Sequence, residues 1–233
     1  SVLRSCLLMP KPKAERYRFK LGMSIHELRM PLEDALALAK DLGMEYVRFN
    51  RLQWEPEIAD LTDEEIDNLG NRIARFGLKL HSISPGAPFK EIHLSNLNLE
   101  TLQDDPSFRE AFCDLVKAMK IARRLGVRAV EAFTFAWPGE YSAGKPTWPM
   151  RWQTRGGIIS EVDLEKLAKA FCLVLEQAEH YDIDIVLSQM AWNYTNTTTN
   201  FKVLAERLGS QRIKVRWGPA DNLNCGEWDV STA

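Results

Sequence analysis

Cysteine is scarce in this chain of 233 residues, and its positions are far apart. The four cysteines are Cys6, Cys113, Cys172 and Cys225, and none of them forms a C-x-x-C pair. This spacing excludes a miniprotein held together by disulfides. We expect all four thiols to be reduced, with Cys113 and Cys172 packed as small apolar side chains in helices, which indicates a cytoplasmic protein.

Long apolar runs and a dominant sign of charge are missing as well. No apolar stretch approaches the ~20 residues that cross a bilayer. The apolar residues 2–9 are followed by basic residues, whereas a signal peptide has them first, so residues 1–19 are interpreted as an N-terminal arm. With 30 Lys+Arg against 32 Asp+Glu, the net charge of −2 provides no field that attracts nucleic acid. We therefore expect neither a membrane nor a nucleic acid as partner.

The sequence does contain a recurring unit: an amphipathic helical pattern, then a glycine, then a short apolar run. Gly43, Gly77, Gly126 and Gly209 occupy this place, and a fifth copy has Asp182 without a glycine. Glycine suits the left-handed residue that ends a helix, and a short apolar run is typical of a buried parallel strand. With an opening strand at 20–25, the pattern predicts six strands and five intervening helices.

The alternation leaves two α/β architectures, a doubly wound sheet and a closed barrel. No G-x-G-x-x-G follows the first predicted strand and no G-x-x-x-x-G-K-[ST] occurs, so a nucleotide-binding sheet loses its main support. The segments after His81 and Phe135 are long, whereas those that precede strands are short. In barrels the loops after the strands build the active face. We therefore predict a (β/α)₈ TIM-type barrel in residues 20–233, with about six β/α units present.

Three segments resemble the xylose-isomerase-like TIM barrel superfamily, which includes sugar phosphate isomerases and epimerases. They are Gly22-Met23-Ser24-Ile25-His26, the Trp192-Asn193-Tyr194-Thr195-Asn196-Thr197 stretch, and Trp217-Gly218-Pro219-Ala220-Asp221-Asn222. The resemblance spans roughly residues 20 to 233. It implies a divalent metal (Mn, Mg, Co or Zn) held by a Glu that ends the fifth strand, an Asp that ends the sixth, and ligands from the seventh and eighth. Such a metal polarises the sugar carbonyl while carboxylates move the proton.

The sequence departs from this pattern at both of the first two ligands. Ser188 stands where the fifth-strand Glu is expected, and Gly218 where the sixth-strand Asp is expected. Neither residue replaces a carboxylate as a ligand for a hard cation, so we predict no metal cofactor for this chain. The repeating units end after the sixth strand, which suggests a truncated barrel. If the chain truly ends at Ala233, its open strand edges predict a homo-oligomer.

The candidate site residues follow from the strand ends and from the aromatic side chains near them. Glu131 interrupts an apolar strand, so it is either paired with an interior Arg or Lys or used in proton transfer or sugar binding. Aromatic rings stack on sugars or simply cover the barrel mouth. The predicted catalytic residues are Glu131 and His81, and the predicted substrate-binding residues are His26, Asn50, Trp54, Trp192, Trp217 and Asp221.

The resulting hypothesis is a sugar isomerase or epimerase-like protein with a degenerate metal site, impaired or inactive, whose partner is a small carbohydrate. An alternative is a non-catalytic protein that uses the same scaffold for carbohydrate binding or assembly. A weaker alternative is a DNA repair enzyme like endonuclease IV. That fold needs a histidine-rich trinuclear zinc site, which the four scattered histidines do not suggest.

Overall fold

Six parallel strands form one curved sheet whose spatial order equals their order in the chain. The computed structural model describes residues 20–49, 60–137 and 157–227. Each strand pairs in parallel with the next. The strands are β1 (Gly22–Ser24), β2 (Tyr46–Phe49), β3 (Lys79–Ile83), β4 (Ala129–Ala132), β5 (Asp184–Ser188) and β6 (Ile213–Arg216).

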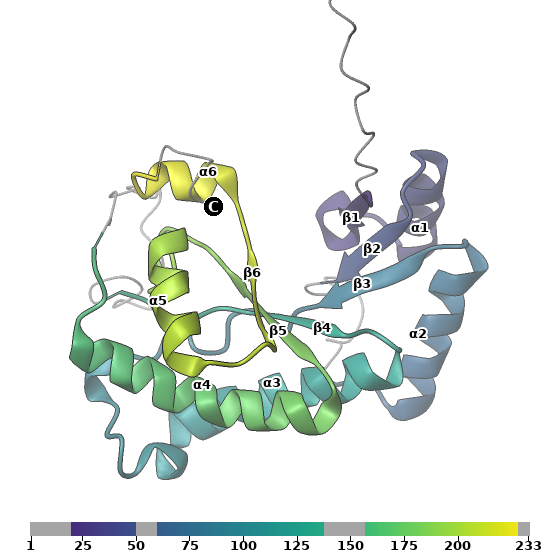
Figure 1. The fold of residues 1–233 in the computed structure, drawn as a ribbon. Helices are drawn as coiled ribbons and strands as arrows, with labels where there is room; N and C mark the ends of the chain where they lie inside the picture. Colours follow the sequence, from purple (N-terminus) through teal and green to yellow (C-terminus); the bar gives the residue numbers. More distant parts are fainter. Residues whose placement is uncertain (1–19, 50–59, 138–156, 228–233) are drawn as a thin grey trace, which may run out of the picture.

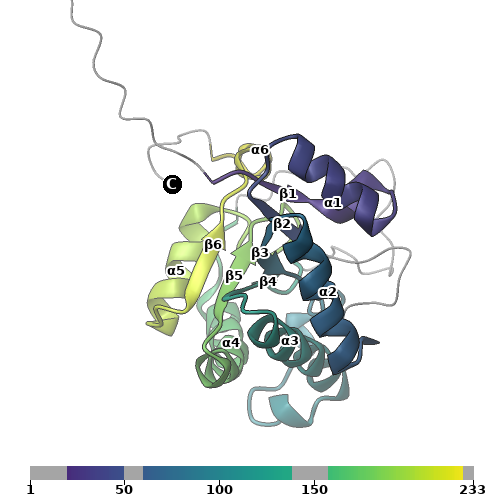
Figure 2. The same cartoon turned by 90° about the vertical axis from the view of Figure 1, so that its right-hand side faces the viewer.

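Helices connect the strands and cover the convex side of the sheet. Figures 1 and 2 show the first five α-helices around the outside of the strands, with the concave face turned inward. The α-helices are α1 (Leu32–Asp41), α2 (Asp63–Arg75), α3 (Pro106–Arg124), α4 (Glu161–Tyr181), α5 (Thr198–Leu208) and α6 (Pro219–Asn224). Short 3₁₀ helices are η2 (Ile25–Leu28), η4 (Leu94–Asn96) and η5 (Leu102–Asp104). The predicted β/α alternation is confirmed, and the described part is a partial (β/α)₈ barrel.

The predicted helix ends are confirmed in their backbone geometry. Gly126, after α3, has φ 68°, in the left-handed region that glycine enters without strain. At the copy without glycine, Asp182 adopts φ 54° instead. Its carboxylate forms ion pairs with Arg128 at 3.4 Å and Arg212 at 2.8 Å. These ion pairs place Asp182 beside two cations from neighbouring segments, and we infer that they help to hold its unfavourable backbone conformation.

Strand alternation separates the hydrophobic core from the concave face. Val130 and Ile185 are fully buried in the core between sheet and helices. Their neighbours in sequence, Glu131 and Val186, line a cavity on the other side of the sheet. Because successive side chains of a strand point to opposite faces, one polar residue within an apolar strand is enough to place a charge inside the barrel.

Two local expectations are corrected by the structure. The opening strand is shorter than 20–25, because Ile25 already begins η2. Cys113 and Cys172 are free but exposed, since they lie on the outer sides of α3 and α4 rather than on the apolar stripe. Cys225 is free and buried, and burial raises the pKa of its thiol to about 11.

Some sequence predictions fall on parts that are not described. The N-terminal arm at 1–19, Asn50 and Trp54 lie outside the described residues. Within the described ranges, no helix combines the length and the apolar character needed to cross a membrane.

Candidate functional site

A cavity of about 370 Å³ lies on the concave face of the sheet, and all six strands contribute to its wall. Its lining combines apolar side chains with a small number of charged ones. The residues are Lys20, Gly22, Met23, Tyr46, Val47, Arg48, His81, Ser82, Glu131, Val186, Val215 and Arg216. Small-molecule sites usually have volumes of roughly 300–1,000 Å³ and this kind of mixed lining. The cavity therefore has the size and composition of a site for a small ligand.

Glu131 lies at the centre of a polar cluster within this cavity. Nη1 of Arg48 donates to both carboxylate oxygens of Glu131, at 2.7 and 2.6 Å, and Oγ of Ser82 donates to Oε1 at 2.8 Å. The Glu131 side chain is only 6% exposed and that of Arg48 19%. The interior ion pair expected as one of two readings for Glu131 is thus present, and its carboxylate is occupied by donors.

A register shift in the sheet creates this arrangement. Between β2 and β3, Val47 pairs with Leu80 and Arg48 pairs with Ser82, so His81 has no partner opposite it. Such a bulge lets one extra residue enter a strand and redirects the side chains around it. As a result Ser82 lies opposite Arg48 and reaches Glu131, while His81 is exposed in the middle of β3. We expected His81 to end the third strand, and this expectation is wrong because β3 continues to Ile83. His81 nevertheless lines the cavity.

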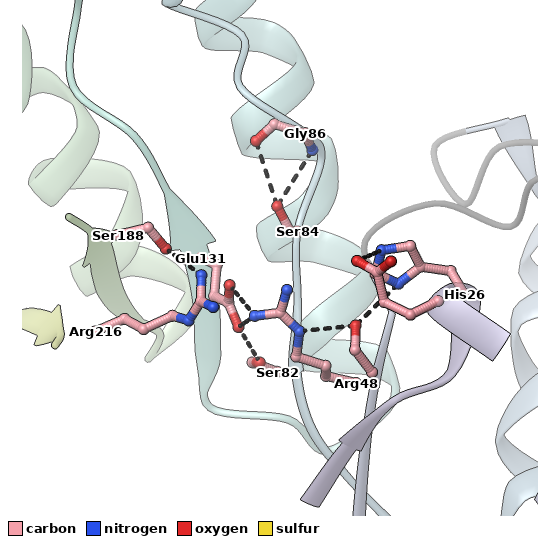
Figure 3. A network of polar contacts seen from close by, with 10 residues as sticks. His26, Arg48, Ser82, Ser84, Gly86, Glu131, Ser188 and Arg216 are labelled. Carbon is pink, nitrogen blue, oxygen red and sulfur yellow. Dashed lines mark hydrogen bonds and ion pairs between the residues drawn. The ribbon is translucent and has the colours of Figure 1, made fainter. Parts of the chain in front are cut away.

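The polar cluster continues from Arg48 toward η2 (Figure 3). Nε of Arg48 donates to Oγ of Ser24 at 3.1 Å, and this hydroxyl is 3.0 Å from Nδ1 of His26. Nε2 of His26 is 3.1 Å from a carboxylate oxygen of Glu27. Burial lowers the pKa of His26, with Arg48 acting in the same direction and Glu27 against it. The imidazole is therefore neutral at pH 7 and orients its neighbours through hydrogen bonds.

The ends of β5 and β6 hold a second polar group that is less completely paired. Nη1 of Arg216 donates to Oγ of Ser188 over a long 3.4 Å (Figure 3). The next residue, Gln189, is 2% exposed, and neither its amide nitrogen nor its amide oxygen has a partner among the described residues. A buried amide without a partner is costly, so this place has hydrogen-bonding capacity that the described residues do not use.

Sequence reasoning did not single out Arg48, Gln189 or Arg216. A signal was present for Gln189, because a polar residue directly after a buried strand lies at the barrel mouth. Arg48 and Arg216 each occur in a short apolar run, as Glu131 does, and such charges face the interior of a barrel. A search for charged residues within the apolar runs, and not only at their ends, identifies Arg48 and Arg216.

The predicted aromatic and acidic residues are not all brought to the cavity. Trp192 is 8% exposed and its ring stacks on Phe133 with centroids 5.5 Å apart, so it covers the sheet. Trp217 is 40% exposed. Asp221 is half-buried in α6, and burial raises the pKa of its carboxyl although Arg216 acts against this shift. None of these three residues belongs to the cavity lining.

The described side chains at the strand ends do not form a set of ligands for a divalent metal. Both oxygens of Glu131 accept hydrogen bonds from Arg48, and Ser188 supplies a hydroxyl. Gly218 supplies no side-chain ligand, and a Cβ added there would lie 3.0 Å from Oδ2 of Asp221. Among the residues with described positions, no three His, Cys, Asp or Glu side chains converge. Two guanidinium groups stand in the cavity instead, and a cation is repelled by them.

Comparisons with known proteins agree with this architecture. The sequence matches the xylose isomerase-like TIM barrel family over residues 36–220. Among solved structures, an L-ribulose 3-epimerase superposes with a TM-score of 0.63 at 22% identity, covering 91% of this chain and 64% of that one. A D-psicose 3-epimerase with D-tagatose from Clostridium cellulolyticum H10 gives 0.65 at 17% identity, with 92% and 68% covered. The IolI protein with a bound zinc atom gives 0.67 at 15%, with 92% and 67% covered.

These structural similarities show the fold alone, because the sequences are so different. The chain spans about two thirds of the length of each of these proteins. No curated protein sequence matches it.

Proposed function

Because the chain belongs to the xylose isomerase-like TIM barrel family, we propose that it binds a small carbohydrate on the concave face of its sheet and is impaired or inactive as a sugar isomerase or epimerase. The family match and the similar epimerase structures support the ligand class. One observation supports the impairment: both carboxylate oxygens of Glu131 already accept hydrogen bonds from Arg48, and Oε1 accepts another from Ser82.

Isomerisation and epimerisation of sugars need a base that removes a carbon-bound proton and a group that polarises the carbonyl. To act as the base, Glu131 must exchange the hydrogen bonds from Arg48 for a substrate proton. Charge-assisted hydrogen bonds of 2.6–2.7 Å are strong, so this exchange is unfavourable. The expected role of Glu131 is therefore to hold Arg48 in place.

Other predicted residues receive roles from their positions. His81 is exposed within the cavity wall and suits a hydrogen bond to a sugar hydroxyl. Trp217 follows β6 with an exposed ring, which suits stacking on an apolar sugar face. Trp192 is assigned to covering the sheet because Phe133 already occupies a face of its ring. The roles of Asn50 and Trp54 stay predictions.

The two alternative functions differ in what the described residues offer them. A non-catalytic carbohydrate-binding or assembly protein uses the same cavity and differs only in the absence of turnover. The endonuclease-like alternative needs several metal ligands together. All four histidines are in the described ranges. No three His, Cys, Asp or Glu side chains in these ranges lie close enough together to hold a metal ion. The homo-oligomer and the cytoplasmic location stay predictions.

The proposal is tested by incubating the 233-residue protein with D-fructose or D-psicose in D₂O, with and without Mn²⁺, and following carbon-bound deuterium by NMR. We expect no exchange above the protein-free control, while calorimetry with the same sugars detects binding. The double variant Ser188→Glu and Gly218→Asp is measured for comparison, because it introduces the two carboxylates that the resemblance places at these positions as metal ligands. Mn²⁺-dependent exchange by the unmodified protein would contradict the proposal.

A further inference from the structure

The cavity on the concave face carries a surplus of positive charge. Lys20, Arg48 and Arg216 line it, and Glu131 is the one carboxylate among the described lining residues. The chain as a whole has a formal net charge of −2. A concave site with low-dielectric walls concentrates the field of such a local surplus. The cavity therefore differs in sign from the protein around it.

Of the two arginines in this cavity, Arg216 is the one whose charge is less compensated. Its side chain donates one hydrogen bond, the 3.4 Å contact with Ser188, and no described carboxylate forms an ion pair with it. Several other arginines of the fold are paired much more closely with carboxylates. Arg72 contacts Glu33 at 2.6 Å, and Arg124 contacts Asp67 at 2.7 Å. Arg216 thus retains most of its donors for another group.

The neighbouring carboxylates do not take up this capacity. Glu131 is held by Arg48 and Ser82. Asp221 is near enough for Arg216 to act against its raised pKa, but burial dominates and the two side chains form no ion pair. A guanidinium with unused donors is the side chain that best recognises a carboxylate or phosphate, because its planar fork matches two oxygens.

We propose that the carbohydrate bound in this cavity carries an anionic group, a carboxylate or a phosphate, and that Arg216 receives this group. The Ser188 hydroxyl lies beside the guanidinium and supplies a further hydrogen bond. Lys20 and Arg48 add positive charge to the same cavity, and the Nη2 atom of Arg48 donates no hydrogen bond to a described residue. This inference rests on the proposed function for the carbohydrate part of the ligand.

The test compares ligands that differ only in the anionic group. The affinities of the 233-residue protein for D-glucitol, D-gluconate, D-glucitol 6-phosphate and inorganic phosphate are measured by calorimetry at constant ionic strength. We expect gluconate or glucitol 6-phosphate to bind at least ~10-fold more tightly than glucitol, as a charge-assisted hydrogen bond implies. The tighter of the two identifies the anion as carboxylate or phosphate.

Variants assign the effect to Arg216. Arg216→Gln removes the charge and is expected to abolish the preference for the anion, so that glucitol, gluconate and glucitol 6-phosphate bind this variant with similar affinities. Arg216→Lys keeps the charge without the fork and is expected to retain part of the preference. Arg109→Gln is the matched control, because Arg109 is exposed on α3, outside the cavity lining, and has no carboxylate partner in the described structure. Circular dichroism and a thermal melt establish that each variant is folded.

The possible results separate this inference from the proposed function. If glucitol binds and the anions gain nothing, or if Arg216→Gln keeps the anion preference, the inference is overturned while the carbohydrate proposal stands. If inorganic phosphate binds through Arg216 as tightly as glucitol 6-phosphate, the anion site stands and the carbohydrate proposal fails. If none of the four ligands binds, both are overturned.

Discussion

Two parts of the concave face use polar residues in opposite ways. The Glu131 cluster, made of Ser24, Arg48, Ser82 and Glu131, connects β1 to β4 through hydrogen bonds of 2.6–3.1 Å. The Arg216 cluster, made of Ser188, Gln189 and Arg216, has one side-chain contact of 3.4 Å and an amide without a partner in the described structure. Charge in the first cluster is satisfied by the fold itself, whereas the second keeps unused donors.

This difference indicates which part of the cavity is structural. A charge removed from water is tolerated when its partners are held in place, and its loss leaves the partner uncompensated. The Glu131 cluster meets this condition, so its residues are expected to matter for stability. A guanidinium that remains partly in contact with water contributes little to stability and is free to bind a ligand. The Arg216 cluster is of this second kind.

The largest predicted effect breaks the Glu131 cluster. Glu131→Ala leaves Arg48 unpaired in a buried site and should lower the free energy of unfolding by about 3–5 kcal/mol. The measurement is urea denaturation followed by circular dichroism. Glu33→Ala is the matched control, because Arg72 contacts Glu33 with two similar hydrogen bonds while the Glu33 side chain is 54% exposed. That control should cost less than about 1 kcal/mol.

A second pair of variants isolates the cause of this loss. Arg48→Met combined with Glu131→Leu removes both charges and should recover most of the stability lost in Glu131→Ala, since no unpaired charge remains. Equal destabilisation by Glu131→Ala and Glu33→Ala would show that the interior pair is no more important than a surface pair.

The next largest effect distinguishes the two tryptophans that follow β5 and β6, Trp192 and Trp217. Trp192→Ala removes a buried ring that stacks on Phe133 and should cost about 3 kcal/mol of stability. Trp217→Ala should leave the melting temperature nearly unchanged and weaken sugar binding by about 1–3 kcal/mol. Thermal melts and calorimetry give the two quantities. A large loss of stability in Trp217→Ala would assign both rings to covering the barrel.

A smaller effect concerns the pH dependence of stability. Because burial raises the pKa of Asp221 above its ordinary value of 3.8, the folded protein pays for ionising it at pH 7. The stability associated with this group is fully present below pH 3.8 and is lost as the pH rises through the folded pKa. Asp221→Asn should therefore be more stable than the parent at pH 7, by a margin that shrinks toward pH 3.8.

Asp182→Asn supplies the opposite sign in the same experiment. Hydrogen bonding from Arg212 and the nearby Arg128 lower the pKa of Asp182, so its contribution is present above pH 3.8 and is lost as the pH falls. This variant should be less stable than the parent at pH 7. Thermal melts from pH 3 to pH 8 test both variants. The same sign for both would refute the assignment of burial to one and pairing to the other.

The smallest predicted effect is on the stability of the Arg216 cluster. Arg216→Gln should change the free energy of unfolding by no more than about 0.5 kcal/mol, because its one long hydrogen bond contributes little. Urea denaturation in the absence of ligand measures this change. Destabilisation comparable with that of Glu131→Ala would mean that both clusters are structural.

The sequence was sufficient for the fold because each β/α unit is specified locally. The signals that specify a unit depend only on residues a few positions away. Examples are the glycine at position 126, the capping residues Thr62 and Glu65, and the apolar runs. The pairing of Arg48 with Glu131 joins positions 83 residues apart, and Ser82 lies opposite Arg48 because of the bulge at His81, which no local pattern indicates. Burial of Trp192 likewise depends on a partner, Phe133, from another strand end. Contacts between distant strands could therefore not be predicted from the sequence and are seen only in the structure.

The most direct test of the contrast between the two clusters follows the Nε–H signals of arginine by ¹⁵N NMR while D-gluconate or D-glucitol 6-phosphate is added. Signals are assigned with the Arg216→Lys and Arg48→Lys variants. The account predicts that the Arg216 signal shifts as ligand is added, while the Arg48 signal, whose Nε–H is bonded to Ser24, moves much less. A ligand-induced shift confined to Arg48, with Arg216 unchanged, would contradict the account.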